Sequence, residues 1–190
     1  VKFGSNIIMD RYIKNGTLPD FDIYGGWRKP NEQYSVATNT PTIEINSGQF
    51  NKIIMGNGMG TNAVSNLQNT TSNNIMGSSS ASFGGTVTVD YTGKMKQEDI
   101  GLIAGGNEIG TIYSNAIINI KNGNVGKIIG GNYADSSNRP TSWAYPLNTF
   151  IGTSTINITG GQIENIIGAS YGRNVNGTTI KSDAYYYGTI

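Results

Sequence analysis

Residues 115–133 read NAIINIKNGNVGKIIGGNY, and the order of apolar and glycine residues in this stretch decides the fold. Ile118 and Ile120 flank Asn119, which is typical of a strand that buries one face. Gly123 then allows a backbone turn that a Cβ would resist. A second apolar run and a Gly-Gly pair complete the unit, so the stretch predicts two short strands joined by a glycine turn.

The same unit recurs along the chain. It returns without gaps at residues 42–58, TIEINSGQFNKIIMGNG, and at residues 155–171, TINITGGQIENIIGASY. Looser copies lie at residues 86–107 and 11–27, with about five extra residues and one extra residue, respectively. The columns shared by the gapless copies are Ile43, Ile118 and Ile156; Ile45, Ile120 and Ile158; Gly48, Gly123 and Gly161; Phe50, Val125 and Ile163; Ile53, Ile128 and Ile166; and Ile54, Ile129 and Ile167. In the copy at residues 86–107 the residues that we align with these columns are Val87, Val89, Gly93, Met95, Leu102, Ile103 and Gly105. In the copy at residues 11–27 they are Ile13, Gly16, Leu18, Phe21, Ile23, Gly25 and Gly26. A fixed internal repeat is typical of proteins built from stacked units.

Strands rather than helices are expected, because β-branched residues dominate and Gly or Asn interrupts each potential helix. Within one copy, we expect Ile43 and Ile45 to face the interior. Phe50, Ile53 and Ile54 should return to this interior on the next side. At ~1.5–3 kcal/mol per buried Ile, the aligned apolar residues of one copy contribute on the order of ten kcal/mol, which backbone ordering largely opposes. One copy alone should not fold, and the repeat predicts a solenoid of stacked β-coils.

The repeat unit, here GNVGKIIGG and GQIENIIGA, resembles repeats of large bacterial surface proteins of the adhesin or pectin-lyase-like kind. The resemblance covers most of the chain through five copies. It implies an all-β fold, a right-handed parallel β-helix of about five coils with long loop insertions, in one domain over residues 1–190. It also implies an extracellular place on a bacterial cell surface. Such helices carry adhesins, lyases and phage tail spikes alike, so the resemblance does not select an activity.

The first and last residues lead us to expect a piece of a longer repetitive protein. The chain begins with Val1 rather than Met, and residues 178–190 resemble the opening strand of another copy that is not completed.

Composition removes several classes of function. A net charge of +1 with 13% charged residues gives no electrostatic case for nucleic acid or an acidic membrane. The chain has no Cys for disulfides and no His, the commonest general base and metal ligand. No apolar stretch reaches the roughly 18 residues that span a bilayer. The acidic residues share no repeat column, and we expect Asp20 and Asp22 to fix a turn. We therefore predict no catalytic residue, no metal and no cofactor.

One column of the repeat is a candidate ligand site. After the Gly exit it holds Trp27, Tyr133 and Tyr171, with Gly58 and Asn107 in the other copies. Aromatic faces suit sugar rings, because CH groups meet the π face while polar tips reach hydroxyls. Trp143 and Tyr145 of a loop insertion could extend such a glycan surface. The alternative is that these rings pack under neighbouring loops.

A second column, Glu44, Thr88, Asn119 and Asn157, should face outward between apolar residues. It could form a polar ladder for glycan, and we favour a solvated strand face.

These observations predict an extracellular, non-enzymatic surface or adhesin segment. Its stiff β-helical stalk would present the loops 59–85 and 134–153 to a host or cell-surface glycan or protein. One alternative is a glycan-binding or polysaccharide-degrading β-helix of the lyase or tail-spike kind. Another is a structural subunit of an extracellular filament, because bare coil ends template further pairing and self-association.

Overall fold

The computed structural model describes residues 2–3, 21–26, 41–56, 74–76, 84–91, 100–108, 111–134, 148–172 and 184–189. These residues form strands, turns and bends, and no helix occurs among them. It follows that this part of the chain offers no helix long and apolar enough to cross a bilayer. The predicted all-β character is confirmed for the described residues.

The strands are short in the first half of the chain and longer in the second. Their bounds are β1 (Lys2–Phe3), β2 (Asp22–Tyr24), β3 (Thr42–Ile45), β4 (Phe50–Ile54), β5 (Asn74–Met76), β6 (Thr86–Asp90), β7 (Ile100–Ala104), β8 (Thr111–Asn122), β9 (Asn124–Ile129), β10 (Tyr133–Ala134), β11 (Asn148–Ile158), β12 (Gln162–Ile167), β13 (Tyr171–Gly172) and β14 (Ala184–Thr189).

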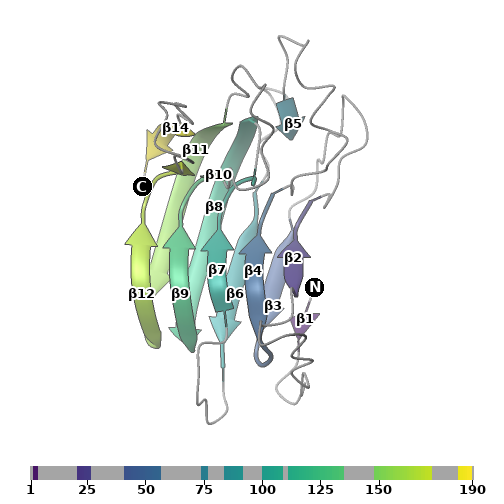
Figure 1. Ribbon diagram of the computed structural model, residues 1–190, viewed down its shortest axis with the longest axis vertical. Helices are drawn as coiled ribbons and strands as arrows, with labels where there is room; N and C mark the ends of the chain where they lie inside the picture. Colours follow the sequence, from purple (N-terminus) through teal and green to yellow (C-terminus); the bar gives the residue numbers. More distant parts are fainter. Residues whose placement is uncertain are drawn as a thin grey trace, which may run out of the picture.

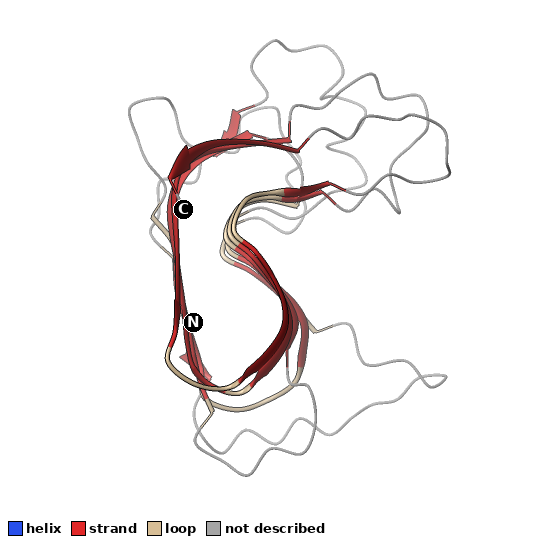
Figure 2. Cartoon of the chain, turned by 90° about the vertical axis from the view of Figure 1, so that its left-hand side faces the viewer, coloured by secondary structure: helices blue, strands red, loops and turns tan. Residues whose placement is uncertain are grey.

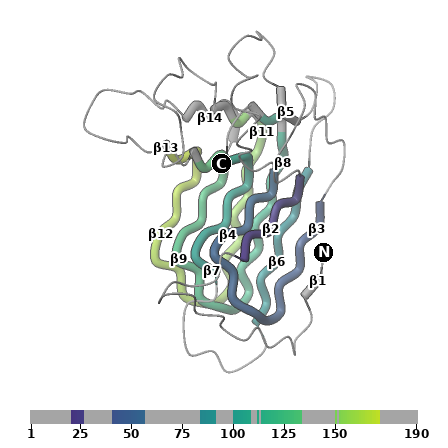
Figure 3. Tube along the Cα trace, turned by 45° about the vertical axis from the view of Figure 1, so that its right-hand side comes forward, coloured from purple at the N-terminus to yellow at the C-terminus, as the bar shows by residue number. Residues whose placement is uncertain are grey.

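Every strand pair among the described residues is parallel, and the two strands of a copy lie in two different sheets. The first sheet has the order β1-β3-β6-β8-β11-β14, with β5 beside β8, and the second has the order β12-β9-β7-β4-β2 (Figure 1). In each of the last four copies, one strand lies in the first sheet and the next strand in the second. The tube in Figure 3 shows the strands of the second sheet side by side. Strands β10 and β13 form a small third sheet.

The pairing register confirms the predicted columns of the gapless copies. Ile118 pairs with Ile156 on one side and with Val87 on the other, and Val87 pairs with Ile43. In the next column Ile45 pairs with Val89, and Ile120 pairs with Val89 and Ile158. In the second sheet the register joins Val125 to Ile163, Ile128 to Ile166 and Ile129 to Ile167.

The core lies between the two sheets, which face each other in Figure 2. Its aliphatic and aromatic side chains are at most 5% exposed. Its buried members are Ile43, Ile45, Phe50, Ile53, Met55, Val87, Val89, Tyr91, Ile100, Ile103, Ile112, Ala116, Ile118, Ile120, Val125, Ile128 and Phe150.

The alignment of the copy at 86–107 was wrong by one residue in its second strand. Ile103 pairs with Ile53 and Ile128, whereas the alignment gave that place to Leu102. Leu102 instead pairs with Lys52 and Lys127. The proposed equivalent of Phe50, Met95, lies outside the described residues, and Ile100 pairs with Phe50.

The first copy needs the same kind of correction. Ile23, not Phe21, pairs with Ile53 and packs against the core, while Phe21 is 43% exposed.

The prediction that Ile53 and Ile54 face one interior was also wrong. Neighbouring residues of a strand point to opposite faces, and Ile54 belongs to a second apolar cluster with Leu102, Ala104 and Ile129. We call these four residues the outer cluster. Tyr24, Tyr133, Ile167 and Tyr171 pack against it.

At the Gly-Gly exit the chain bends sharply where it comes close to the first sheet and then turns away from that sheet (Figure 2). A Cβ on Gly130 would overlap the carbonyl oxygen of Gly168 and the Oγ of Ser154. Glycine is therefore required here by close approach. The predicted turn between the strands also holds, since Gly123 has a φ of 129°.

Candidate functional site

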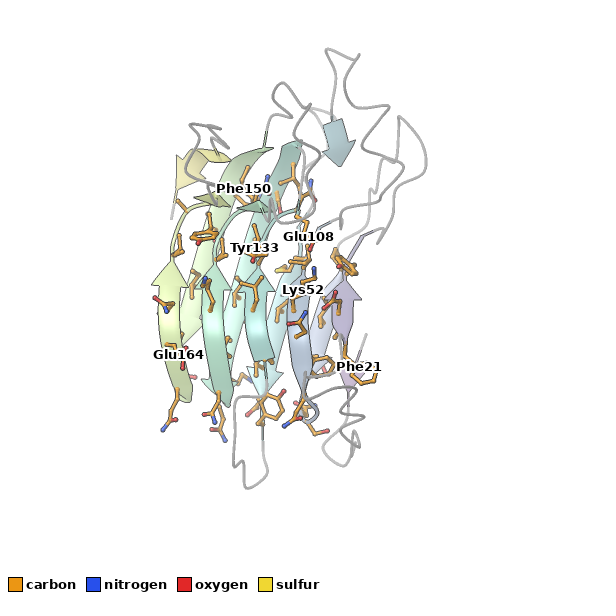
Figure 4. The ribbon with its side chains drawn as sticks, in the orientation of Figure 1. Phe21, Lys52, Glu108, Tyr133, Phe150 and Glu164 are labelled. Atoms are coloured by element: carbon orange, nitrogen blue, oxygen red, sulfur yellow. The ribbon has the colours of Figure 1, made fainter. Side chains whose placement is uncertain are left out.

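The candidate site is a groove on the outer face of the second sheet, beside the point where the chain leaves it for β10. The groove has a volume of about 280 Å³ and is lined by Asn51, Lys52, Gly101, Leu102, Lys127 and Tyr133. We call it the tyrosine groove. Figure 4 shows Tyr133, Lys52 and Glu108 gathered in this part of the molecule, away from Phe21 and Glu164.

Buried amides hold the bend that forms one wall of the groove. The backbone N–H of Asn107 donates to Oδ1 of Asn132 at 2.8 Å, and the N–H of Asn132 donates to Oγ of Ser170 at 3.0 Å. Asn107 and Asn132 are fully buried. Our reading of the sequence missed this ladder, although Gly-Gly-Asn in two copies was the available signal.

Two of the predicted aromatic residues do come together. Tyr133 pairs with Tyr171 between β10 and β13, and their rings stack with centroids 5.9 Å apart and an angle of 14° between planes. Both side chains are half-buried and pack against the outer cluster. Part of each ring thus packs, as the alternative held, and part remains accessible. Trp27, Trp143 and Tyr145 lie outside the described residues.

The aromatic column was assigned wrongly in the third copy. The N–H of Tyr171 donates to the carbonyl of Asn132, and the N–H of Tyr133 donates to the carbonyl of Asn107. Asn107 therefore corresponds to Asn132, and Glu108 takes the place of a tyrosine. The one-residue error in this copy's alignment produced the wrong assignment.

Lys127 reaches across the groove toward the tyrosine stack. Its Nζ lies 4.7 Å from the ring centroid of Tyr171, within the range of a cation–π interaction. Among the residues the structure describes, no carboxylate lies within ion-pair distance of this ammonium group. Within the described part of the chain, this ammonium group therefore meets an aromatic face rather than a counterion.

A charged cluster closes the other end of the groove. Lys52 pairs with Glu108 and lies 3.5 Å from Asp22. The hydroxyl of Tyr24 donates to Asp22 at 3.2 Å and lies 3.5 Å from Glu108. Asn51 donates to Asp22 at 3.0 Å. The expectation that Asp22 fixes a turn was wrong, because Asp22 lies in β2 and contacts the next copy.

The cluster shifts the ionisation of two of its members. Burial raises the pKa of Tyr24 to about 12, with help from the negative charge of Glu108. Burial by itself would lower the pKa of Lys52, but the hydrogen bond and charge of Glu108 outweigh it and raise that pKa. At neutral pH Lys52 is therefore charged and Tyr24 is neutral.

The second predicted column exists on the first sheet. Thr88 pairs with Glu44 and Asn119, and Asn157 pairs with Asn119. Nδ2 of Asn157 donates to Oδ1 of Asn119 at 2.9 Å. Nδ2 of Asn119 in turn lies 3.4 Å from Oγ1 of Thr88. These side chains bond to one another along the sheet.

The described residues contain no group of three or more acidic side chains that could hold a metal ion. Comparison of the chain with family models, with curated proteins and with solved structures finds no match in any of the three.

Proposed function

We propose that this chain is a right-handed parallel β-helix segment of an extracellular bacterial surface protein, and that it binds carbohydrate without catalysis. The fold proposal is supported by the parallel pairing of successive copies in two sheets, in which the apolar columns stay aligned. Such a scaffold is stiff, because each inner strand of the two sheets is fixed by neighbours on both sides.

The observation that carries the binding function is the Tyr133–Tyr171 stack beside the groove. Stacked rings offer a platform for the CH groups of a sugar, and the side chains of Asn51 and Lys52 supply donors for its hydroxyls. In this proposal the loops 59–85 and 134–153 add contacts to a host or cell-surface glycan or protein.

A non-enzymatic role fits the protonation of the cluster better than a polysaccharide-degrading role. A general base must be unprotonated near the working pH. The raised pKa values of Lys52 and Tyr24 keep both side chains protonated there.

A filament subunit remains a second candidate, favoured by the fifth copy. Ile158 and Ile166 are 41% and 52% exposed, whereas their partners in the fourth copy, Ile120 and Ile128, are fully buried. Strand β12 is also the last strand of its sheet. These features support pairing of this face with a further coil.

The binding function is tested by screening the protein on a glycan array and then measuring affinity for a bound glycan by calorimetry. Tyr171→Ala should weaken binding about tenfold, as expected for one lost aromatic contact. Asn157→Ala, on the first sheet, should leave it unchanged. An array without any bound glycan, or a Tyr171→Ala variant with full affinity, would contradict the proposal.

A further inference from the structure

We propose that the tyrosine groove selects an anionic saccharide and that Lys127 holds its carboxylate or sulfate group. The inference rests on the proposed carbohydrate-binding function and adds the chemical class of the ligand. It assigns the anion to the Tyr171 end of the groove and a neutral, hydroxyl-rich sugar to the Glu108 end.

The first step of the argument is the charge of the groove lining. Its charged members are Lys52 and Lys127, and none of the described residues that line it is acidic. Lys52 is already neutralised by Glu108 and Asp22. Lys127 is therefore the cation of this lining that can still balance a ligand's charge.

The second step concerns what surrounds Lys127. In the sheet it pairs with Leu102 on β7 and Asn165 on β12, neither of which carries charge. The side chain is half-buried, so a charge-assisted hydrogen bond from it is less weakened by water than one on an open surface. The ring of Tyr171 faces the ammonium group. One ring face cannot accept all three N–H donors of this group, so donors remain for a ligand.

The third step concerns the acidic residue of the neighbouring strand. Glu164 precedes Asn165 on β12 and is exposed. It forms no ion pair with Lys127 among the described residues, and Figure 4 shows it away from Tyr133 and Lys52. Its carboxylate therefore leaves the charge of Lys127 available to a ligand.

The effect of the anionic group is distinguished from that of the sugar with three polymers that share one backbone. They are dextran, carboxymethyl dextran and dextran sulfate. Wild-type protein should bind at least one charged polymer about tenfold more tightly than dextran at low salt, as one charge-assisted contact gives. The tighter of the two charged polymers identifies the anion as carboxylate or sulfate. Lys127→Met should remove this preference, Lys127→Arg should keep it, and Glu164→Gln should leave it nearly unchanged.

The matched control is Lys121→Met. Lys121 is an exposed lysine of β8 whose Nζ lies 3.9 Å from Asp90, so its loss changes net charge equally without touching the groove. Equal affinity of wild type and Lys127→Met for the charged polymers, or an equal loss in Lys121→Met, would overturn the inference. In either case, glycan binding that still depends on Tyr171 would leave the proposed function intact. Failure of all polymers and of the glycan array would overturn both. Thermal unfolding of each variant checks that a change in affinity does not come from misfolding. Lys127→Gln replaces Lys127→Met if the latter does not fold.

Discussion

Lys52 on β4 and Glu108, which follows β7, form an ion pair although they lie 56 positions apart and belong to different copies of the repeat. Glu108 stands where the next copies carry Tyr133 and Tyr171. A glutamate in place of a tyrosine at this position of the repeat therefore forms an ion pair instead of an aromatic stack. The tyrosine groove thereby gains one aromatic end and one ionic end.

Removal of this contact should destabilise the protein. Glu108→Gln leaves Lys52 half-buried with only Asp22 as a counterion, and we expect the free energy of unfolding to fall by about 1–3 kcal/mol. Urea denaturation measures this loss. Asp90→Asn, which removes the exposed pair with Lys121, should cost no more than about 0.5 kcal/mol. Equal effects of the two substitutions would show that burial of the pair does not matter.

The cluster also predicts how stability depends on pH. Folding raises the pKa of Tyr24 from its ordinary value near 10 to about 12, and it raises the pKa of Lys52 as well. A raised pKa means that the folded protein holds the proton more tightly. Its stabilising contribution is complete below the unfolded pKa and is lost as pH rises through the folded pKa.

The free energy of unfolding should therefore be level from neutral pH to about pH 10. It should then decline toward pH 12. Tyr24→Phe should flatten part of this decline, and absorbance of tyrosinate should report one tyrosine that ionises late. A decline that begins below pH 9 would contradict the assignment of Tyr24.

The amide ladder allows a comparison between two asparagines. Asn132→Ala removes the acceptor of the buried Asn107 N–H, and we expect a loss of about 1–3 kcal/mol in unfolding free energy. Because the ladder holds the bend before Tyr133, ligand affinity should fall too. Asn157→Ala deletes an exposed amide of the other ladder and should change stability by about 0.5 kcal/mol or less. Similar losses in both variants would argue against a special role for the buried amide.

The filament candidate predicts concentration-dependent association. Ile158→Lys combined with Ile166→Lys places charge on the exposed face of the fifth copy, and it should lower the average mass seen by sedimentation at high concentration. Ile117→Lys is the control, because Ile117 is 39% exposed but lies on β8, an inner strand of the first sheet. A monomeric wild-type protein at every concentration would remove the support for this candidate.

The gapless copies made most of the first-sheet register predictable. Ile43, Ile118 and Ile156 could be aligned because nothing is inserted between their strand and the glycine turn. The third copy could not be aligned securely, because the length of an insertion carries no signal of where pairing resumes. Leu102 and Ile103 are adjacent apolar residues that the sequence pattern does not tell apart, and the pairing places Ile103 opposite Ile53 and Ile128.

The site was predictable in part for the same reason. Tyr133 and Tyr171 occupy equal positions in gapless copies, so their stacking followed from the repeat. Glu108 was missed because the error of one residue put Asn107 in its place. The cation–π contact of Lys127 was missed because the sequence pattern does not tell which side chains of an outward face meet across a bend.

The insertion between β6 and β7 leaves both strands paired in parallel with their neighbours on either side. The distance between neighbouring strands along the stack is consequently independent of how many residues a copy contains. Lys52 and Lys127, two strands apart, stay separated by about two strand spacings of roughly 4.8 Å along the stack. An insertion can thus lengthen a loop at the edge of the molecule while the distance between Lys52 and Lys127 stays the same.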